Sequence, residues 1–419
     1  MKRLNAPKAW SQLLFATPTE PWAALRAAAA AGVAATTATL IDAGLRGRGG
    51  GGFLTGAKWQ ATAAEPASQH YAVANGYESD PAVFTNRLLM EENPQAVVEG
   101  LAIAALTVGA REAFIAVRAE YTEAIKRLEA VIANAERERI LGATLLGTGR
   151  ELIITIRPLQ GSSMIGEETV LMKALAGKRG QPEQTPPYPS EVGYLGKPTA
   201  VNNVATLAAV PWILNNGAGA FAQIGDTAQP GTVLVQISGS VANPGVIEVP
   251  TGTPLNEIIA AAGGTASGAS IKALLAGGPT GGFIPANLFG GTPYSGAGLK
   301  SVGAHIGSGA LLALDNSVAI PELATMLTRW CADEACGKTI PCRIGTRRLA
   351  EIGQRFVDGL AGPADAERLQ KLAADVTDSA LCALEALAPS PLLTGVRYFA
   401  SEFGPSVAAP SATPTSGRS

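Results

Sequence analysis

The sequence predicts an α/β protein in three parts: a Rossmann-like α/β domain at residues 1–225, a small β-grasp (ubiquitin-like) domain at 226–318 and a C-terminal helical bundle at 319–403. Three observations predict this architecture. Short apolar runs alternate with helical periodicity in the first part. Val- and Ile-rich segments separated by turn residues fill the second part. The third part has helical spacing and contains all four cysteines.

Strand and helix patterns alternate along the first part. The predicted strands are short apolar runs, at 71–74, 113–117 and 151–156. The predicted helices have apolar residues every three to four positions, at 97–110, 121–140 and 166–176. Since this alternation places helices on the faces of a sheet, we expect the sheet to be mostly parallel.

The pattern changes after Gly225. Two Val/Ile-rich segments, 231–237 and 245–249, flank a turn at Asn243-Pro244. A predicted helix at 255–262 and a predicted strand at 271–276 follow. Strand, turn, strand, helix and strand in so few residues indicate a β-grasp module. At the C-terminus, residues 404–419 are rich in Pro, Ser, Thr and Ala, which predicts a disordered tail.

The composition of the chain limits the kinds of partner that we expect it to bind. The formal net charge of the 419 residues is -2, so there is no basic field to hold nucleic acid or an anionic membrane. Charged residues make up 16% of the chain, against a typical value of about 25%, which fits a subunit that covers part of its surface with protein partners. The most apolar stretch, 22–41, carries Arg26 and three threonines, so we expect no membrane insertion. With no signal-peptide pattern, the expected location is the cytoplasm, including the cytoplasmic face of a membrane complex.

A glycine-rich loop stands out at 44–59, GLRGRGGGGFLTGAKW. Glycines let the backbone approach a ligand closely, and successive free N–H groups can form an anion-binding nest. Arg46, Arg48 and Lys58 add positive charge. The loop therefore suits the phosphates of a dinucleotide or flavin, although it is not the usual G-x-G-x-x-G fingerprint. A flexible linker is the alternative, but linkers are usually Ser-rich and do not interleave Arg, Phe, Lys and Trp.

This loop resembles G-L-R-G-R-G-G-A-G-F-P-T-G-x-K-W of the NADH-binding flavoprotein subunits of respiratory complex I. That family is shared with NAD-linked formate dehydrogenases and hydrogenases. Gly51 stands where the family has Ala. The likeness continues in order through NGYESDPAVFTNR at 75–87, GEET at 166–169, GKRGQP at 177–182, PPYP at 186–189 and GKPTAVNNV at 196–204. Because chance would not keep this order, the chain is identified as a member of the superfamily.

The resemblance implies an enzyme, an FMN-dependent NADH dehydrogenase (diaphorase) subunit. NADH would give a hydride to FMN, and single electrons would leave through an iron–sulfur cluster to a partner subunit. The expected partner is a ferredoxin-like companion within complex I, or a formate dehydrogenase or hydrogenase module. The alternative is a degenerate paralogue, a structural or FMN-binding assembly subunit with weak or no NADH oxidation.

The resemblance also carries site residues onto this chain. In the loop, the residues expected at the nucleotide and flavin are Gly47, Arg48, Gly49, Gly50, Gly52, Phe53, Gly56 and Lys58. Beyond it, the residues expected to hold FMN and shape its surroundings are Asn75, Glu78, Gly166, Glu167, Glu168, Asn202, Asn203 and Thr206. Phe53 and Tyr188 would offer aromatic surface to the nucleotide. Asp80 stands where the family has a Glu that contacts the NADH ribose, and its charge would disfavour a 2′-phosphate.

Four departures from the family pattern fall in the same site. Tyr77 replaces an Asp, Ala61 an adenine-stacking Phe, Ser163 a Tyr and Thr185 a nucleotide-binding Lys. Loss of a stacking ring or of a charged contact costs about 1–3 kcal/mol of affinity each. Family drift compensated elsewhere, and a paralogue that weakened NADH use, are both open.

The cysteines are Cys331, Cys336, Cys342 and Cys382, and their clustering late in the chain indicates a metal or cluster site. The family binds a [4Fe–4S] cluster through C-G-x-C-x-P-C-R and a distant Cys. Here the implied ligands are Cys336, Cys342 and Cys382, and Thr339 takes the place of the second ligand. A three-iron cluster, a four-iron cluster with a hydroxyl or water on one iron, and no cluster are all open. Cys331 is predicted to be a packed core thiol.

Overall fold

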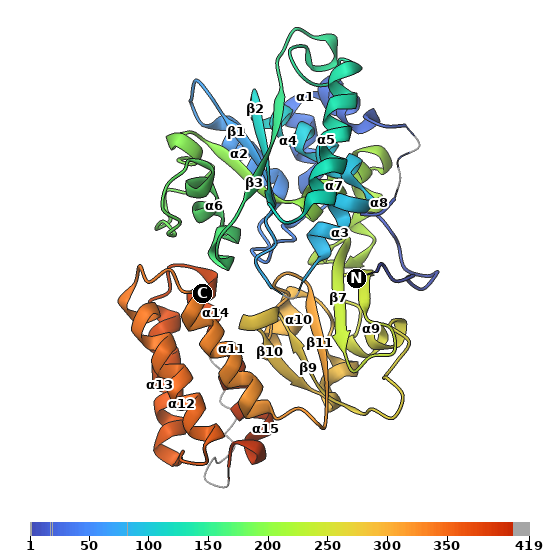
Figure 1. Cartoon of the computed structure of the whole chain (residues 1–419). Coiled ribbons are helices and arrows are strands. Elements are labelled where there is room, and N and C mark those ends of the chain that lie inside the picture. The colour runs from blue at the N-terminus through green and yellow to red at the C-terminus, as the bar shows by residue number, and fades with distance from the viewer. Residues whose placement is uncertain (1, 17, 19, 82, 405–419) are drawn as a thin grey trace.

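The computed structural model describes residues 2–404 except 17, 19 and 82. Nearly all of the predicted tail therefore lies outside the described residues. Figure 1 shows a parallel sheet with its helices at the top, a second sheet below it, and a group of helices, in orange and red, beside the second sheet.

The upper sheet is four-stranded and parallel among the described residues, in the order β3-β2-β1-β4. Its strands are β1 (Tyr71–Gly76), β2 (Glu112–Arg118), β3 (Ile153–Leu159) and β4 (Thr199–Asn203). The predicted parallel sheet is thus confirmed. Strand β4 carried no strand signal of its own, because it is short and ends in two asparagines. Pairing with β1, from Tyr71–Thr199 to Asn75–Asn203, forms it.

Helices cover both faces of this sheet. They are α1 (Ala23–Asp42), α2 (Thr55–Ala64), α3 (Thr85–Glu92), α4 (Pro94–Val108), α5 (Thr122–Arg137), α6 (Glu168–Leu175), α7 (Val204–Asn216) and α8 (Ala218–Ala222). One face packs on α4 and α7, whose side chains are buried nearly all round. The opposite face packs on α6 through a second cluster that includes Val73, Phe114 and Leu171.

Helix α1 is long and apolar enough to cross a membrane by length and composition alone. It packs against α2, α4 and α7, and its N-terminal N–H groups, those of Trp22 and Leu25, donate to the buried carboxylate of Glu99 on α4. Core helices of this kind meet the same length and composition test. These contacts hold α1 against the first core, and 33% of its most apolar window is buried.

The second sheet is mixed and five-stranded in the described chain, in the order β10-β9-β11-β7-β8. Its elements are β7 (Thr232–Gly239), β8 (Gly245–Pro250), α9 (Leu255–Ala261), β9 (Ile271–Ala276), β10 (Gly282–Pro285), α10 (Gly296–Ser301) and β11 (Ala310–Asp315), preceded by the short pair β5 (Gly225–Asp226) and β6 (Gln229–Pro230). The N-terminal segment joins this sheet. Leu4 packs in its core, and the N–H groups of Leu13 and Leu14 donate to Glu248 on β8, at 2.7 and 2.9 Å.

Helices α11 (Ile320–Glu334), α12 (Thr346–Val357), α13 (Pro363–Asp378), α14 (Ala383–Leu387) and α15 (Ser390–Phe399) form the third part. Their core takes in Ala273, Leu275 and Phe283 from the second sheet. A π-helical turn, Pro341–Gly345, leads into α12 and carries Cys342. The helices therefore pack on the second sheet and bring the cysteine segment towards the parallel sheet.

Candidate functional site

The glycine loop lies between α1 and α2 and is held in place by backbone bonds. The N–H of Gly47 donates to the carbonyl of Phe53 at 2.9 Å, and that of Arg48 donates to Oγ1 of Thr206 at 2.8 Å. Gly50 and Gly52 have left-handed φ angles of 99° and 61°. A Cβ on Gly51 or Gly52 would meet no atom within 4 Å, so this part of the loop faces open space. The loop thus offers backbone to a ligand beside the start of α7.

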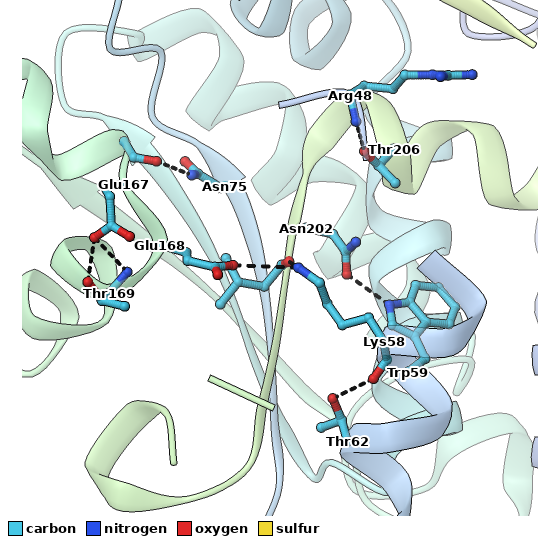
Figure 2. A network of polar contacts seen from close by, with 12 residues as sticks. Arg48, Lys58, Trp59, Thr62, Asn75, Glu167, Glu168, Thr169, Asn202 and Thr206 are labelled. Atoms are coloured by element: carbon cyan, nitrogen blue, oxygen red, sulfur yellow. Dashed lines mark hydrogen bonds and ion pairs between the residues drawn. The ribbon is translucent and has the colours of Figure 1, made fainter. Parts of the chain in front are cut away.

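The two arginines of the loop serve its attachment. Arg46 donates to the carbonyls of Ala228, at 3.0 Å, and Gly52, at 3.2 Å. The Arg48 guanidinium turns away from the other site residues (Figure 2) and donates to the carbonyl of Pro230. Its burial lowers the pKa of Arg48 to about 10, and its Nη1 has no hydrogen-bond partner. The expectation that Arg48 adds charge at the phosphates is therefore corrected: its guanidinium ties the loop to the second part.

Lys58 is the cation that remains at the site. Its Nζ lies 3.0 Å from the carbonyl oxygen of Val201 on β4 and 3.5 Å from Oε2 of Glu168 on α6 (Figure 2). The neighbouring Trp59 is buried and donates from Nε1 to Oδ1 of Asn202 at 2.8 Å. Gly56 has a packing role, because a Cβ there would lie 2.7 Å from the carbonyl oxygen of Thr37 on α1.

The turn at Gly166 and the start of α6 form a second part of the candidate site. The side-chain amide of Asn75 donates to the carbonyl of Gly166 at 2.8 Å. Glu167 caps α6, since its Oε2 accepts the N–H groups of Thr169, at 3.0 Å, and Val170, at 2.9 Å. A Cβ on Gly166 would lie 2.7 Å from Cβ and Oγ of Ser79, so the turn sits tightly against the loop that follows β1.

The N-terminus of α7 completes the wall beside the glycine loop. Asn203 caps it by accepting the N–H of Ala205 at 2.8 Å, and Gly49 lies against Asn203, where a Cβ would be 3.2 Å from the asparagine Cβ. The positive end of a helix and free loop N–H groups suit a phosphate. The structure therefore brings together at one edge of the sheet Gly47, Gly49, Gly50, Gly52, Lys58, Asn75, Gly166, Glu167, Glu168, Asn202, Asn203 and Thr206.

The Glu78 carboxylate lies at the start of α3. It caps α3, accepting the N–H groups of Asn86, at 2.8 Å, and Arg87, at 3.2 Å, and the hydroxyls of Thr85, at 3.0 Å, and Tyr121, at 3.2 Å. The side chain is buried, and desolvation raises the pKa of Glu78 to about 7. All of these partners belong to the fold, so the Glu78 carboxyl caps α3, and the residue also lines the cavity that Asp80 borders. Its place around the flavin stays a prediction.

The Glu78 carboxyl should make stability depend on pH. Its folded pKa of about 7 lies above the ordinary carboxyl value, so the folded chain keeps a proton that the unfolded chain has released. The contribution of Glu78 to the free energy of unfolding should be fully present below about pH 4. It should fall by about 3 kcal/mol as the pH rises to about 7. In Glu78→Gln this part of the fall should vanish. Urea unfolding of both proteins at pH 5 and 8 measures it, and equal pH dependence would contradict the assignment.

Asp80 and Ser163 line a second cavity of about 400 Å³ beneath the strand ends. Asp80 lies against the turn of the second part, where a Cβ on Gly278 would be 1.9 Å from its Oδ2. Ser163 donates its N–H to Glu334 of α11 at 2.8 Å, and its buried Oγ has no partner. Tyr77 is buried in the core under α6, with its hydroxyl donating to the carbonyl of Gly161 at 2.8 Å, so its ring has become part of the fold.

Two aromatic side chains of the candidate site are exposed to solvent. Phe53 is 59% exposed and Tyr188 is 54% exposed, which is unusual for such apolar groups and suits a stacking surface. Ala61 and Thr185, where the family pattern has Phe and Lys, are exposed as well. The structure leaves room at both positions for the larger side chains.

The three predicted cluster ligands converge. Cys336, Cys342 and Cys382 line one small pocket together with Thr339 and Glu385, and Met164 and Pro182 close it from the α/β part. Burial raises the pKa of the Cys342 thiol to about 12 and that of Cys382 to about 11. Cys331 lies apart, fully buried in α11, with Sγ 3.8 Å from the carbonyl oxygen of Pro279. Met164 lies two residues before Gly166, so the cysteine pocket adjoins the wall of the first site.

Comparison with known proteins agrees with this geometry. Residues 40–212 match the Nuo51 FMN-binding domain, 234–284 the SLBB domain and 322–405 the NADH-ubiquinone oxidoreductase-F iron-sulfur binding region. The NADP-reducing hydrogenase protein HndC of Solidesulfovibrio fructosivorans is 39% identical over 88% of this chain and 76% of its own length. The second F subunit of the NADH-quinone oxidoreductase of Rhizobium meliloti is 36% identical over 86% of both chains.

The chain belongs to the family of NADH-quinone oxidoreductase F subunits. A crystal structure of NAD+-reducing [NiFe]-hydrogenase in the H2-reduced state superposes with a TM-score of 0.85 at 31% identity, covering 94% of this chain and 66% of that chain. Members of the family are FMN-dependent oxidoreductase subunits with an iron–sulfur region, and they work within multi-subunit complexes.

The residues of this F-type oxidoreductase protein fit FMN. The open glycine face and the capped start of α7 suit a phosphate, and Lys58 and the amides of Asn75 and Asn202 border the same space. At the cysteine pocket, three thiols fit three irons of a cluster, whereas Thr339 breaks the usual set of four. Among the described residues, no three His, Cys, Asp or Glu side chains are close enough to share a single metal ion.

Sequence reasoning missed Glu385. This buried carboxylate lines the pocket of the cysteines, and its position three residues after Cys382 resembles an ordinary first-turn acid of a helix. An acidic side chain beside an implied ligand, at the same time as a ligand replacement, is the signal that could have pointed to it.

Proposed function

We propose that this chain is the NADH-oxidising flavoprotein of a multi-subunit redox complex, delivering electrons through the cysteine pocket to a ferredoxin-like partner. The observation that carries the proposal is the convergence of the glycine loop, Lys58, Asn75 and the start of α7 at the carboxyl edge of a parallel sheet. Ligands of open α/β sheets bind at this edge. Bound FMN supplies the exchange between a hydride and single electrons, and a cluster supplies single-electron relay.

In this proposal the chain's own residues bind and orient. The loop N–H groups and the α7 dipole hold the FMN phosphate. Lys58, fixed between Val201 and Glu168, places a positive charge beside the flavin ring. Phe53 and Tyr188 receive the adenine, and Asp80 favours NADH over NADPH because a 2′-phosphate would meet like charge.

We also propose the finer architecture: an FMN/NADH domain at 1–225, a β-grasp domain at 226–318 and a helical iron–sulfur domain at 319–403. Three apolar cores, each centred in one of the three parts, support these limits, although the cores of the first and third parts also take in side chains from the second. We place the chain in the cytoplasm or at the cytoplasmic face of a membrane through its complex.

An assembly subunit that binds FMN without oxidising NADH is the second candidate, and the four altered positions favour it. The deciding experiment is an anaerobic NADH titration of purified, FMN-reconstituted protein, followed by flavin absorbance. Stoichiometric bleaching supports the dehydrogenase. Flavin that stays oxidised at millimolar NADH overturns it and leaves the assembly role.

The exposed ring of Phe53 should govern NADH affinity. Phe53→Ala removes a stacking partner worth about 1–3 kcal/mol, so the Kd for NADH should rise about 5- to 150-fold. Ala61→Phe should lower it by a similar factor, since it supplies the second ring. Both positions are exposed, so stability should hardly change. Met326→Ala, at an equally exposed apolar side chain on α11, is the matched control. No change of Kd in either variant would contradict the adenine site.

A further inference from the structure

The cysteine pocket contains a carboxylate, Glu385, next to the position of the missing fourth thiolate. Thr339, at the position of the missing ligand, donates its hydroxyl to Oε1 of Glu385 at 2.6 Å. The same hydroxyl oxygen accepts the N–H of Cys342 at 3.3 Å. With its proton committed to Glu385, Thr339 is held as a neutral donor and is a poor ligand for iron. Its contacts orient Glu385.

The burial of Glu385 calls for a cation. Only 1% of the residue is exposed. Within the described chain its acceptor contacts are the Thr339 hydroxyl and the N–H of Leu381, at 2.9 Å, and no Lys or Arg forms an ion pair with it. Buried carboxylates are normally paired with a cation or bound to a metal. A carboxylate has about four lone-pair positions, so two remain open here.

The charge of the lining groups and the position of Glu385 both indicate that this cation is the iron of a cluster. Glu385 lines the same pocket as Cys336, Cys342 and Cys382, together with the apolar Met164, Pro182, Leu381 and Leu384 and with Lys338. The Lys338 ammonium is taken by other partners, the carbonyl of Pro182 and Oε2 of Glu183 at 3.2 Å. Three thiolates and one carboxylate carry the same formal charge as the four thiolates that hold a cubane. A single ion would need its ligands gathered around one point, which the described residues do not show. A cubane instead takes each ligand on a different iron, and so needs them further apart.

We propose that Glu385 is the fourth ligand of a four-iron cluster held by Cys336, Cys342 and Cys382, with Thr339 positioning its carboxylate. This deepens the proposed function, on which it rests for the presence of a cluster. It replaces the alternatives of a three-iron cluster and of a hydroxyl-bound iron. The iron held by Glu385 would have an oxygen ligand and the other three would have sulfur.

The test measures iron, sulfide and electron paramagnetic resonance in anaerobically reconstituted full-length protein. The wild type should hold about four irons and four sulfides per chain, and Glu385→Gln should fall to about three irons with the signal of an oxidised three-iron cluster. Thr339→Val should keep four, because it removes only the positioning hydroxyl. The double variant Thr339→Cys/Glu385→Gln should regain four through a thiolate.

Other outcomes overturn the proposal. They are a wild type with three irons or none, Glu385→Gln that keeps four, or Thr339→Val that loses the fourth iron while Glu385→Gln keeps it. If Glu385→Gln does not fold, Mössbauer spectra of wild-type protein loaded with iron-57 decide: three sulfur-bound irons to one oxygen-bound iron support the proposal, and four equivalent sites refute it. Bleaching of FMN by NADH needs no iron, so a failure here is distinct from a failure of the dehydrogenase function.

Discussion

Replacing Gly166 by alanine should weaken FMN binding about 10- to 100-fold while the chain stays folded. The φ angle of Gly166 lies outside the left-handed region, so the backbone itself accepts alanine. The new Cβ would, however, lie 2.7 Å from Cβ and Oγ of Ser79. Relieving such an overlap costs about 1–3 kcal/mol and would move the turn that Asn75 holds against the flavin space. Quenching of FMN fluorescence on titration with protein measures the Kd.

A second substitution makes this prediction specific. Ser79→Gly removes both atoms that the new Cβ would strike, and the next neighbour, the carbonyl oxygen of Tyr77 at 3.5 Å, is in ordinary contact. The double variant Gly166→Ala/Ser79→Gly should therefore recover most of the lost affinity. Thermal unfolding of all three proteins serves as the control for folding. If Gly166→Ala binds FMN as the wild type does, the turn is not part of the flavin wall.

Replacing Gly100 by alanine should cause the largest loss of stability, about 3 kcal/mol or more. Gly100 lies where α4 crosses α7, and a Cβ there would be 2.0 Å from the carbonyl oxygen of Leu207 and 2.6 Å from its carbon. These are backbone atoms inside a helix, so they cannot turn aside, and α7 must shift. Because α7 begins at the Asn203 cap and carries Thr206, FMN binding should weaken as well. Thermal unfolding followed by circular dichroism measures the loss.

Gly51→Ala is the matched control. A Cβ on Gly51 would meet no atom within 4 Å, and its φ is not left-handed, so the change in stability should stay within about 0.5 kcal/mol. Alanine is also the residue that the family pattern has at this position. A comparable loss in Gly51→Ala and Gly100→Ala would show that the cost comes from losing glycine and not from the helix crossing.

The candidate site illustrates how much of its structure sequence motifs can predict. The order of the motifs predicted that the loop, Asn75, Gly166 and Asn203 belong together, and the parallel sheet explains why: three of these segments lie at or beyond its strand ends. The same motifs placed the Arg48 charge at the phosphates, whereas its guanidinium donates to Pro230. They gave no sign that the Glu78 carboxyl would cap α3. A motif gives the position of a residue along the chain, whereas the direction of its side chain depends on which neighbour offers the better hydrogen bonds. For Glu78 these are the free N–H groups of α3.

By itself, the sequence determined the α/β class, the parallel sheet, the glycine-rich loop and the candidate cysteines, because periodicity and glycine or cysteine spacing are local properties. Only the tertiary structure decided what depends on distant partners. Strand β4 exists through its pairing with β1, and the N-terminal segment is fixed by Glu248, more than 230 residues away. Thr339 and Glu385 are 46 residues apart in the chain, with the π-helical turn, α12 and α13 between them. No local sequence pattern encodes such contacts. They form only when packing buries both partners, so that each becomes the best hydrogen-bonding group within reach of the other.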